Sequence, residues 1–165
     1  MHHSHTHSHT HSMTEPKEIL VMMLIMFIAG LLSTMNIWVD KLNDIRFHLN
    51  DVYMSLLMCS WCLILMGIYH ISICLLVVGI VLTCIIIYFI RNQILIDETE
   101  YIKGMIPHHS MAILMSKKLL ENTNSNEIDI LPKVKKLAQN IINSQEDEIN
   151  FMKIVLNYKE HMKKI

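Results

Sequence analysis

The sequence predicts an all-α protein in which three transmembrane helices are followed by a soluble two-helix hairpin. The first observation is the composition, because 52% of the 165 residues are hydrophobic and the mean hydropathy is positive, which is unusual for a soluble globular protein. The second is that apolar residues gather before position 96 in runs long enough to cross a bilayer. The third is that the more charged remainder, residues 97–165, has the spacing of amphipathic helices.

Charge and cysteine content narrow the class further. The net charge is -1 with histidine neutral, so no broad basic surface is present and we expect no nucleic-acid partner. The four cysteines lie in apolar runs, where the disulfides of a small secreted domain would not be placed, and they are predicted to be free thiols.

Residues 1–15 form a His-rich tail. Residues 2–12 are only His, Ser and Thr, so no side chain there can join a core and we expect disorder. The tail is either a loose metal-binding arm or an engineered or incidental extension, and the sequence leaves both open. Its candidate auxiliary metal ligands are His2, His3, His5, His7, His9 and His11.

The membrane domain, residues 16–96, is expected to contain helices at about residues 18–39, 52–69 and 72–91. Residues 19–39 carry no charge, and at about 1.5 Å per residue they span a hydrocarbon core of about 30 Å. This run is too long for a cleaved signal peptide. Residues 52–90 are apolar over about twice the length of one span, which predicts two helices joined by a tight turn around residues 69–72.

Three spans place the two ends of the chain on opposite sides of the bilayer. Lys41, Arg46, Arg91 and Lys103 fall on the side of the hairpin, whereas Lys17 alone falls on the side of the tail. Because positively charged residues favour the cytoplasmic side, we expect the hairpin in the cytoplasm of a multi-pass membrane protein. The numbers are small, and the opposite topology stays open.

The hairpin itself is expected within residues 97–165. Asp97 resembles an N-cap followed by acidic residues, and the first helix should run to about Leu120. Residues 121–126 are rich in Asn and indicate a loop, and residues 127–159 resume a helical pattern with Pro132 near the first turn. Since a lone pair of helices buries little core, we expect a homo-oligomer, most simply a dimer that forms a four-helix bundle.

Residues 105–115 contain a soft-metal ligand set, because two adjacent histidines are accompanied by three methionines. Imidazole binds several transition metals, whereas thioether sulfur is a useful ligand mainly for Cu(I). Copper is therefore the expected metal, with Cu(I) favoured and Cu(II) or zinc as alternatives. Core packing is the other explanation for the methionines. The candidate ligands in this segment are Met105, His108, His109, Met111 and Met115.

The two histidines point in different directions on a regular helix. At about 100° per residue, all three methionines lie within about 60° of His108, whereas His109 is turned about 100° away, toward a neighbouring helix. Pro107 disfavours the helical conformation of the residue before it, so the helix should kink or restart there. The segment therefore supplies half of a site.

Gln145, Glu148 and Met152 are candidates for the other half. Their i, i+3, i+7 spacing places them on one face of the second helix, where two polar side chains interrupt an apolar stripe. Packed against His108, Gln145 or Glu148 would ligate the metal or orient an imidazole through its second nitrogen. The alternative is that both lie at the solvated edge of an amphipathic helix.

A second series of soft ligands lies in the middle apolar segment. Its members recur every four residues and form a ridge that would line a helix–helix contact or a metal path, although ordinary packing in lipid explains the same pattern. The series consists of Met54, Met58, Cys62, Met66 and His70, with Cys59 beside it.

Two motifs lie in residues 97–156: Tyr101-x3-Met105-Ile106-Pro107-His108-His109-x2-Ala112-Ile113-x-Met115 and Leu137-Ala138-x2-Ile141-Ile142-x2-Gln145-x2-Glu148-Ile149-x2-Met152. With these motifs the chain resembles a bacterial family of ferritin-like helical bundles, domain of unknown function 305. This resemblance implies a ferritin-like half-bundle that binds copper and serves copper tolerance. Many members have Gly or Gln where this chain has Ser110, and the motif occurs once here, so stoichiometry and ligand set stay open.

These observations predict a membrane-anchored protein that captures or buffers copper through a His/Met cluster. One alternative is a transporter or chaperone that conducts copper along the Met/Cys series of the second span. Another is a membrane protein whose hairpin only mediates oligomerisation. No nucleophile and base pair, phosphate loop or metalloprotease motif occurs, so we expect no enzyme, although a copper-dependent redox activity stays open.

Overall fold

The structure, a computed structural model, describes residues 16–124 and 131–162. Within these ranges all regular secondary structure is helical and there is no strand, which confirms the all-α class. The elements are α1 (Pro16–Leu32), the short 3-10 helices η1 (Met35–Trp38) and η2 (Leu42–Asp44), α2 (Leu49–Tyr69), α3 (Ile73–Arg91), α4 (Glu98–Asn124) and α5 (Pro132–Met162).

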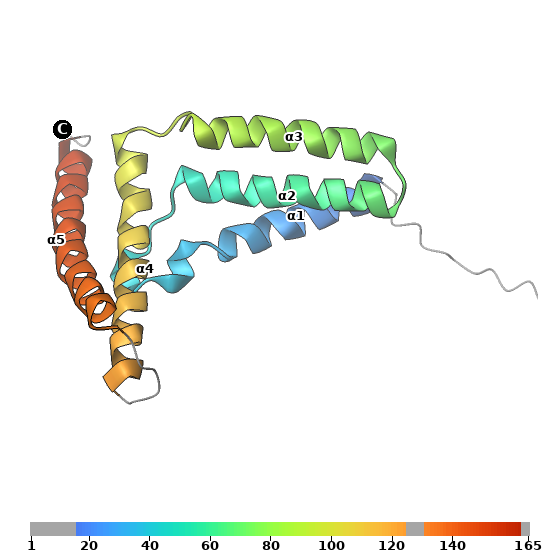
Figure 1. Ribbon diagram of the computed structural model, residues 1–165. Coiled ribbons are helices and arrows are strands. Elements are labelled where there is room, and N and C mark those ends of the chain that lie inside the picture. The colour runs from blue at the N-terminus through green and yellow to red at the C-terminus, as the bar shows by residue number, and fades with distance from the viewer. Residues whose placement is uncertain (1–15, 125–130, 163–165) are drawn as a thin grey trace, which may run out of the picture.

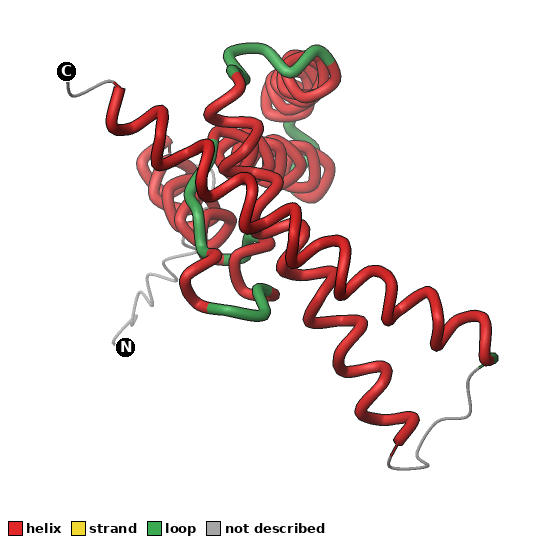
Figure 2. Tube along the Cα trace, turned by 90° about the vertical axis from the view of Figure 1, so that its left-hand side faces the viewer, coloured by secondary structure: helices red, strands yellow, loops and turns green. Residues whose placement is uncertain are grey.

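The helices form two groups that meet at a steep angle. Helices α1, α2 and α3 lie side by side, and the hairpin of α4 and α5 runs across the end of this group (Figure 1). The view turned by 90° shows the three helices nearly end-on behind the crossing hairpin (Figure 2). The helical segments Pro16–Trp38, Leu49–Tyr69 and Ile73–Arg91 are long and apolar enough to cross a membrane.

The first apolar segment is not one continuous helix, in contrast to the expected span of residues 18–39. Helix α1 ends at Leu32, and the chain then turns into η1. The Asn36 side chain holds this turn, because its Oδ1 accepts from the Arg46 backbone N–H at 2.9 Å and its Nδ2 donates to the Arg46 carbonyl at 3.0 Å. A hydropathy profile contains no information on a hydrogen bond between residues ten positions apart, so the end of α1 could not be predicted from it.

Helices α2 and α3 pack closely because glycines remove side chains from their contact. A Cβ atom added to Gly67 would lie 2.6 Å from the Leu76 nitrogen, and one added to Gly79 would lie 2.8 Å from the Ile64 nitrogen. Since both obstacles are backbone atoms, any larger residue must push the helices apart. The turn between them occupies residues 70–72 and is closed by the Ser72 N–H donating to the Gly67 carbonyl at 2.8 Å.

The hairpin joins α4 and α5 along an antiparallel seam whose residues are spaced alternately four and three apart, as in a coiled coil. On α4 the buried seam residues are Ile102, Ile106, His109, Ile113 and Ser116. On α5 the corresponding positions are Ala138, Ile142, Gln145, Ile149, Met152 and Leu156. Six of these residues form the hydrophobic core of the hairpin: Ile102, Ile106, Ile113, Ile149, Met152 and Leu156.

Helix α4 continues through Pro107 without restarting, because the proline ring is fully buried and tertiary packing outweighs its poor helix propensity. Helix α4 also extends four residues beyond the expected end at Leu120, to Asn124. Helix α5 begins at Pro132, five residues later than the expected start at position 127. A proline suits this first position because its missing N–H has no partner within the helix.

Candidate metal centre on the helical hairpin

His109 occupies a seam position between α4 and α5 and is 8% exposed. Its Nδ1 lies 3.1 Å from Glu148 Oε2 on α5, but the oxygen is out of line with the ring N–H, so the contact is electrostatic and not a hydrogen bond. Among the described residues no partner contacts Nε2. The carboxylate favours the proton on Nδ1, which leaves the Nε2 lone pair for a ligand.

Burial sets the protonation state of this imidazole. It lowers the pKa of His109 below its ordinary value, and the neighbouring His108 lowers it further, while Glu148 acts in the opposite direction. His109 is therefore neutral near pH 7, and only a neutral imidazole has a lone pair to give to a metal.

His108 lies on the exposed side of α4. Its ring centroid is 5.8 Å from that of His109, with an angle of 56° between the ring planes. Met115, which is 56% exposed, and the half-buried Met111 follow His108 at i+7 and i+3. These three side chains therefore form a stripe that is separate from the seam.

Met152 and Gln145 belong to the seam, and Met105 lies beside it. Met152 is part of the hydrophobic core, and Met105 packs against that core. Gln145 occupies a seam position one turn before Glu148, and its Oε1 is buried without a hydrogen-bond partner among the described residues. Two polar seam residues, His109 and Gln145, thus each have a buried atom without a hydrogen-bond partner among the described residues.

The fold places the candidate ligands of the hairpin in two groups. The sequence places Met105, Met111 and Met115 around His108, whereas Met105 lies with His109 at the core and the other two stay with His108. Glu148 faces His109, not His108. Across residues 16–124 and 131–162, no three His, Cys, Asp or Glu side chains form a metal-binding group, so a metal held here needs thioether or amide ligands.

Comparison with known proteins places this hairpin in a family. The model of a domain of unknown function, DUF305, matches residues 97–156, which contain α4 and most of α5. The chain is 45% identical over 155 residues to the uncharacterized protein L153 of Acanthamoeba polyphaga mimivirus, which covers 89% of this chain and 96% of L153. The chain belongs to the family of L153 and carries a DUF305 domain. No solved structure matches it.

The DUF305 hairpin is bound to the connection between α1 and α2, a contact that the sequence does not reveal. Asp44 of η2 is 2% exposed, accepts a hydrogen bond from Ser110 Oγ at 2.6 Å and forms an ion pair with Lys153 of α5. The same Ser110 oxygen accepts from the Asp40 backbone N–H at 2.9 Å. The connection between α1 and α2 is therefore part of the packed structure.

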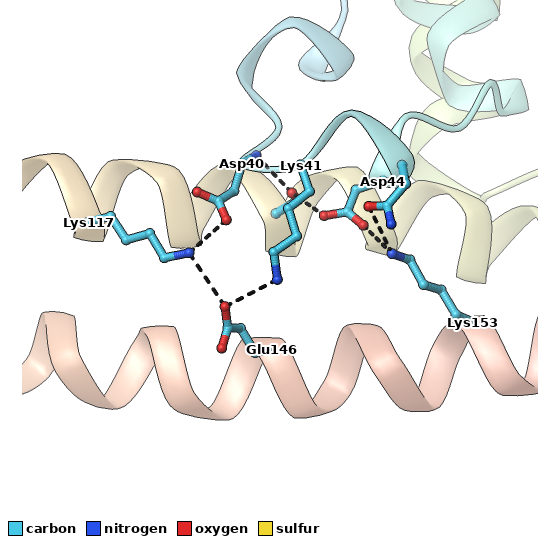
Figure 3. Close-up of polar contacts among 8 residues, drawn as sticks. Asp40, Lys41, Asp44, Lys117, Glu146 and Lys153 are labelled. Carbon is cyan, nitrogen blue, oxygen red and sulfur yellow. Dashed lines mark hydrogen bonds and ion pairs between the residues drawn. The ribbon is translucent and has the colours of Figure 1, made fainter.

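Charged side chains continue this contact along α4 and α5, as Figure 3 shows. Lys117 contacts Asp40 at 2.7 Å and Glu146 at 3.5 Å, and Lys41 reaches the same Glu146 oxygen at 3.5 Å. The hydrogen bond to Asp40 raises the pKa of Lys117, although partial burial acts against this. The lysine therefore stays charged and holds the connection to both helices of the hairpin.

The Met/Cys series of α2 does not share a single environment. Met54 is exposed, and the Met58 methyl group lies against Gly30 of α1. The Cys59 thiol donates to the Met23 carbonyl at 3.5 Å, so it too faces α1. Cys62, Met66 and His70 are half-buried farther along α2. The histidines of residues 2–11 lie outside the described residues.

Lowering the pH below about 6.5, the ordinary pKa of histidine, is expected to destabilise the metal-free protein partly through His109. Because the folded pKa is the lower one, unfolding takes up a proton as the pH falls through this window, and the free energy of unfolding decreases. Thermal unfolding at about pH 7.5 and about pH 5.5 measures the loss. His109→Gln should lose less stability than the wild type, and equal losses would contradict the expectation.

Proposed function

We propose that this chain is a membrane-anchored, non-enzymatic protein that captures or buffers Cu(I) at the DUF305 hairpin. The observation that carries the proposal is His109, a neutral imidazole with Glu148 beside Nδ1 and no partner on Nε2 among the described residues. A metal-ligating histidine usually donates its other ring N–H to a carboxylate or carbonyl, and Glu148 Oε2, 3.1 Å from Nδ1, is the carboxylate at that position here. His108 next to it supplies a second imidazole at the surface.

The separation of the two rings supports one shared ion. With metal–nitrogen bonds of about 2 Å, each ring centroid lies about 3 Å from a metal bound to that ring. The observed 5.8 Å between centroids is therefore within reach of a two-coordinate ion. Met105 beside the seam and Met111 beside His108 are the nearest thioethers in sequence, and thioethers select Cu(I) over Cu(II) or zinc.

The arrangement of the helices supports a place at the membrane surface. With α1, α2 and α3 crossing the bilayer, the hairpin lies across their ends, along the surface (Figure 1). Lys41, Arg46 and Arg91 are at that end, and positive residues favour the cytoplasmic side. Copper bound there is withdrawn from the redox reactions of the free ion.

A second copy of the chain is the proposed partner of the hairpin. Phe151, Ile154 and Tyr158 form an apolar stripe on the outer face of α5, each about two-thirds exposed at 67%, 68% and 65%. Within the described chain α5 packs mainly on α4. Two stripes in contact would complete a four-helix bundle. Ile154→Glu should shift the oligomer toward monomer in sedimentation velocity, and an unchanged distribution would oppose this pairing.

Titration of the purified chain with Cu(I) against a competing chelator tests the copper proposal. The variant His108→Ala/His109→Ala should lose the tightest Cu(I) equivalent, because both imidazoles are removed. His161→Ala is the matched control, since His161 is an exposed histidine near the end of α5. Unchanged Cu(I) affinity in the double variant would refute the proposal.

A further inference from the structure

The connection between α1 and α2, residues 33–48, turns its acidic side chains inward. Asp44 is 2% exposed, and the side chain of Asp40 is 12% exposed. Both carboxylates point toward the hairpin, where they contact Lys153 and Lys117 (Figure 3). In a segment that faces water, acidic side chains are mostly at the surface. The connection is therefore polar on the side that it buries against the hairpin.

The large hydrophobic side chains of the connection are exposed. The Asn36 side chain brings the two ends of this set together, because it bonds the backbone N–H and the carbonyl of Arg46 at 2.9 and 3.0 Å. An exposed apolar patch of this kind marks contact with another protein or with a membrane. The set, which we call the outer face of the connection, has exposed fractions between 45% and 84% and consists of Ile37, Trp38, Leu42, Ile45 and Phe47.

The position of the connection favours a lipid surface as the partner of this outer face. Helix α1 ends at Leu32 and α2 begins at Leu49, and both belong to segments long and apolar enough to cross a membrane. Both ends of the connection therefore lie at the same surface of the bilayer, between the apolar helices and the hairpin (Figure 1). Tryptophan prefers this layer, because its ring is apolar and its N–H is polar, and Trp38 is one of the exposed residues.

Arg46 adds a positive charge to the outer face. Its Nη1 donates to the backbone carbonyls of Asn43 at 2.9 Å and Ile45 at 2.7 Å. These carbonyls hold the guanidinium in place without neutralising it, and within residues 16–124 and 131–162 no carboxylate forms an ion pair with it. Arginine binds phosphate through charge-assisted hydrogen bonds, and anionic phospholipids present phosphate at the membrane surface. The charge of the connection thus complements an anionic bilayer.

We propose that the connection is an interfacial anchor, in which the outer face inserts between the headgroups of the bilayer and Arg46 binds the phosphate of an anionic phospholipid. The inference rests on the membrane anchoring proposed above, but it does not depend on copper binding. Because Asp40 and Asp44 join the same connection to α4 and α5, the anchor also holds the hairpin against the membrane surface. The connection thus contacts lipid on one side and the hairpin on the other.

Tryptophan fluorescence tests the depth of the anchor, because the chain has two tryptophans, Trp38 and Trp61. The full chain with Trp61→Phe is reconstituted in vesicles of phosphatidylcholine and phosphatidylglycerol whose acyl chains carry bromine, a quencher, near the headgroup or near the chain end. Trp38 should be quenched more by the shallow bromine. Trp38→Phe is the matched control, since Trp61 is about 18 Å along α2 from Leu49 and should be quenched more by the deep bromine. Absence of quenching of Trp38 while Trp61 is quenched, as expected if a second copy covered the outer face, would overturn the anchor. If neither is quenched, the membrane placement on which the anchor rests fails with it, whereas the Cu(I) titration of the hairpin is unaffected.

The same vesicles test the role of Arg46 when only one of the two lipids is brominated. Shallow bromine on phosphatidylglycerol should quench Trp38 more than the same amount on phosphatidylcholine, because the guanidinium gathers anionic lipid beside it. Arg46→Gln should make the two values equal. Lys17→Gln, which removes one positive charge at the other end of α1, should leave the difference unchanged. Equal quenching by the two lipids before substitution would overturn the binding of anionic lipid by Arg46.

Discussion

Replacing Asp44 with alanine should destabilise the protein by about 2 to 4 kcal/mol, because a buried ion pair loses one partner. Asp44 is 2% exposed, and its carboxylate holds Lys153 of α5 and the hydroxyl of Ser110 on α4. Without it, Lys153 keeps a partly buried charge and Ser110 loses its acceptor. The contact between the hairpin and the apolar helices is then the first to open.

Chemical denaturation of the detergent-solubilised protein measures this loss. Lys118→Ala is the control, since Lys118 forms an ion pair with Glu121 in which both side chains are exposed, and such pairs contribute at most about 1 kcal/mol. Asp44→Asn should fall between the two, because it removes the charge but keeps a hydrogen-bond acceptor for Ser110. A destabilisation by Asp44→Ala no larger than that of Lys118→Ala would show that the docked connection contributes little.

Replacing Glu148 with glutamine should weaken Cu(I) binding about 10- to 100-fold, the usual cost of removing the group that supports a metal-ligating histidine. Glu148 does not need to touch the metal for this effect. Its carboxylate lies 3.1 Å from His109 Nδ1 and favours the proton there, which keeps Nε2 unprotonated. Glutamine has nearly the same shape but no charge, so this preference is lost.

Two controls distinguish the proposed role of Glu148 in positioning His109 from an effect on stability or on net charge. Glu148 is 55% exposed at its side chain, so Glu148→Gln should leave the unfolding midpoint of the metal-free protein nearly unchanged. Asp147→Asn removes one negative charge from the adjacent exposed position and should leave the Cu(I) affinity unchanged. If Asp147→Asn weakens binding as much as Glu148→Gln does, the effect is one of net charge and the positioning role of Glu148 is wrong.

Local patterns explain how far the sequence predicts this fold. Hydropathy finds three long apolar helices, and the four-and-three spacing finds the hairpin seam, because both depend on residues close in sequence. The same spacing puts Gln145 and Glu148 near one face. It does not say which histidine of α4 this face meets. In the structure that histidine is His109, whereas the sequence analysis expects His108.

Contacts between distant residues explain what the sequence analysis misses. Asp44 and Ser110 are 66 positions apart. The ring of His48, the residue before α2, lies beside Gly104 of α4. The available signal is that Gly104 and Ser110 are small residues on a helix of mostly large ones, and small residues mark places where another segment approaches closely. His48 carries no local signal, because its unsatisfied nitrogens are visible only in the folded chain.

The most direct test of the copper proposal is nitrogen NMR of the full chain with nitrogen-labelled histidine. Spectra are recorded as one equivalent of Cu(I) is added. Cu(I) is diamagnetic, so the imidazole signals remain observable. The expected result is that His109 Nε2 shifts on metal binding while Nδ1 stays protonated beside Glu148, and that the His108 ring shifts in the same titration. Tight binding of Cu(I) with both rings unchanged would contradict the account.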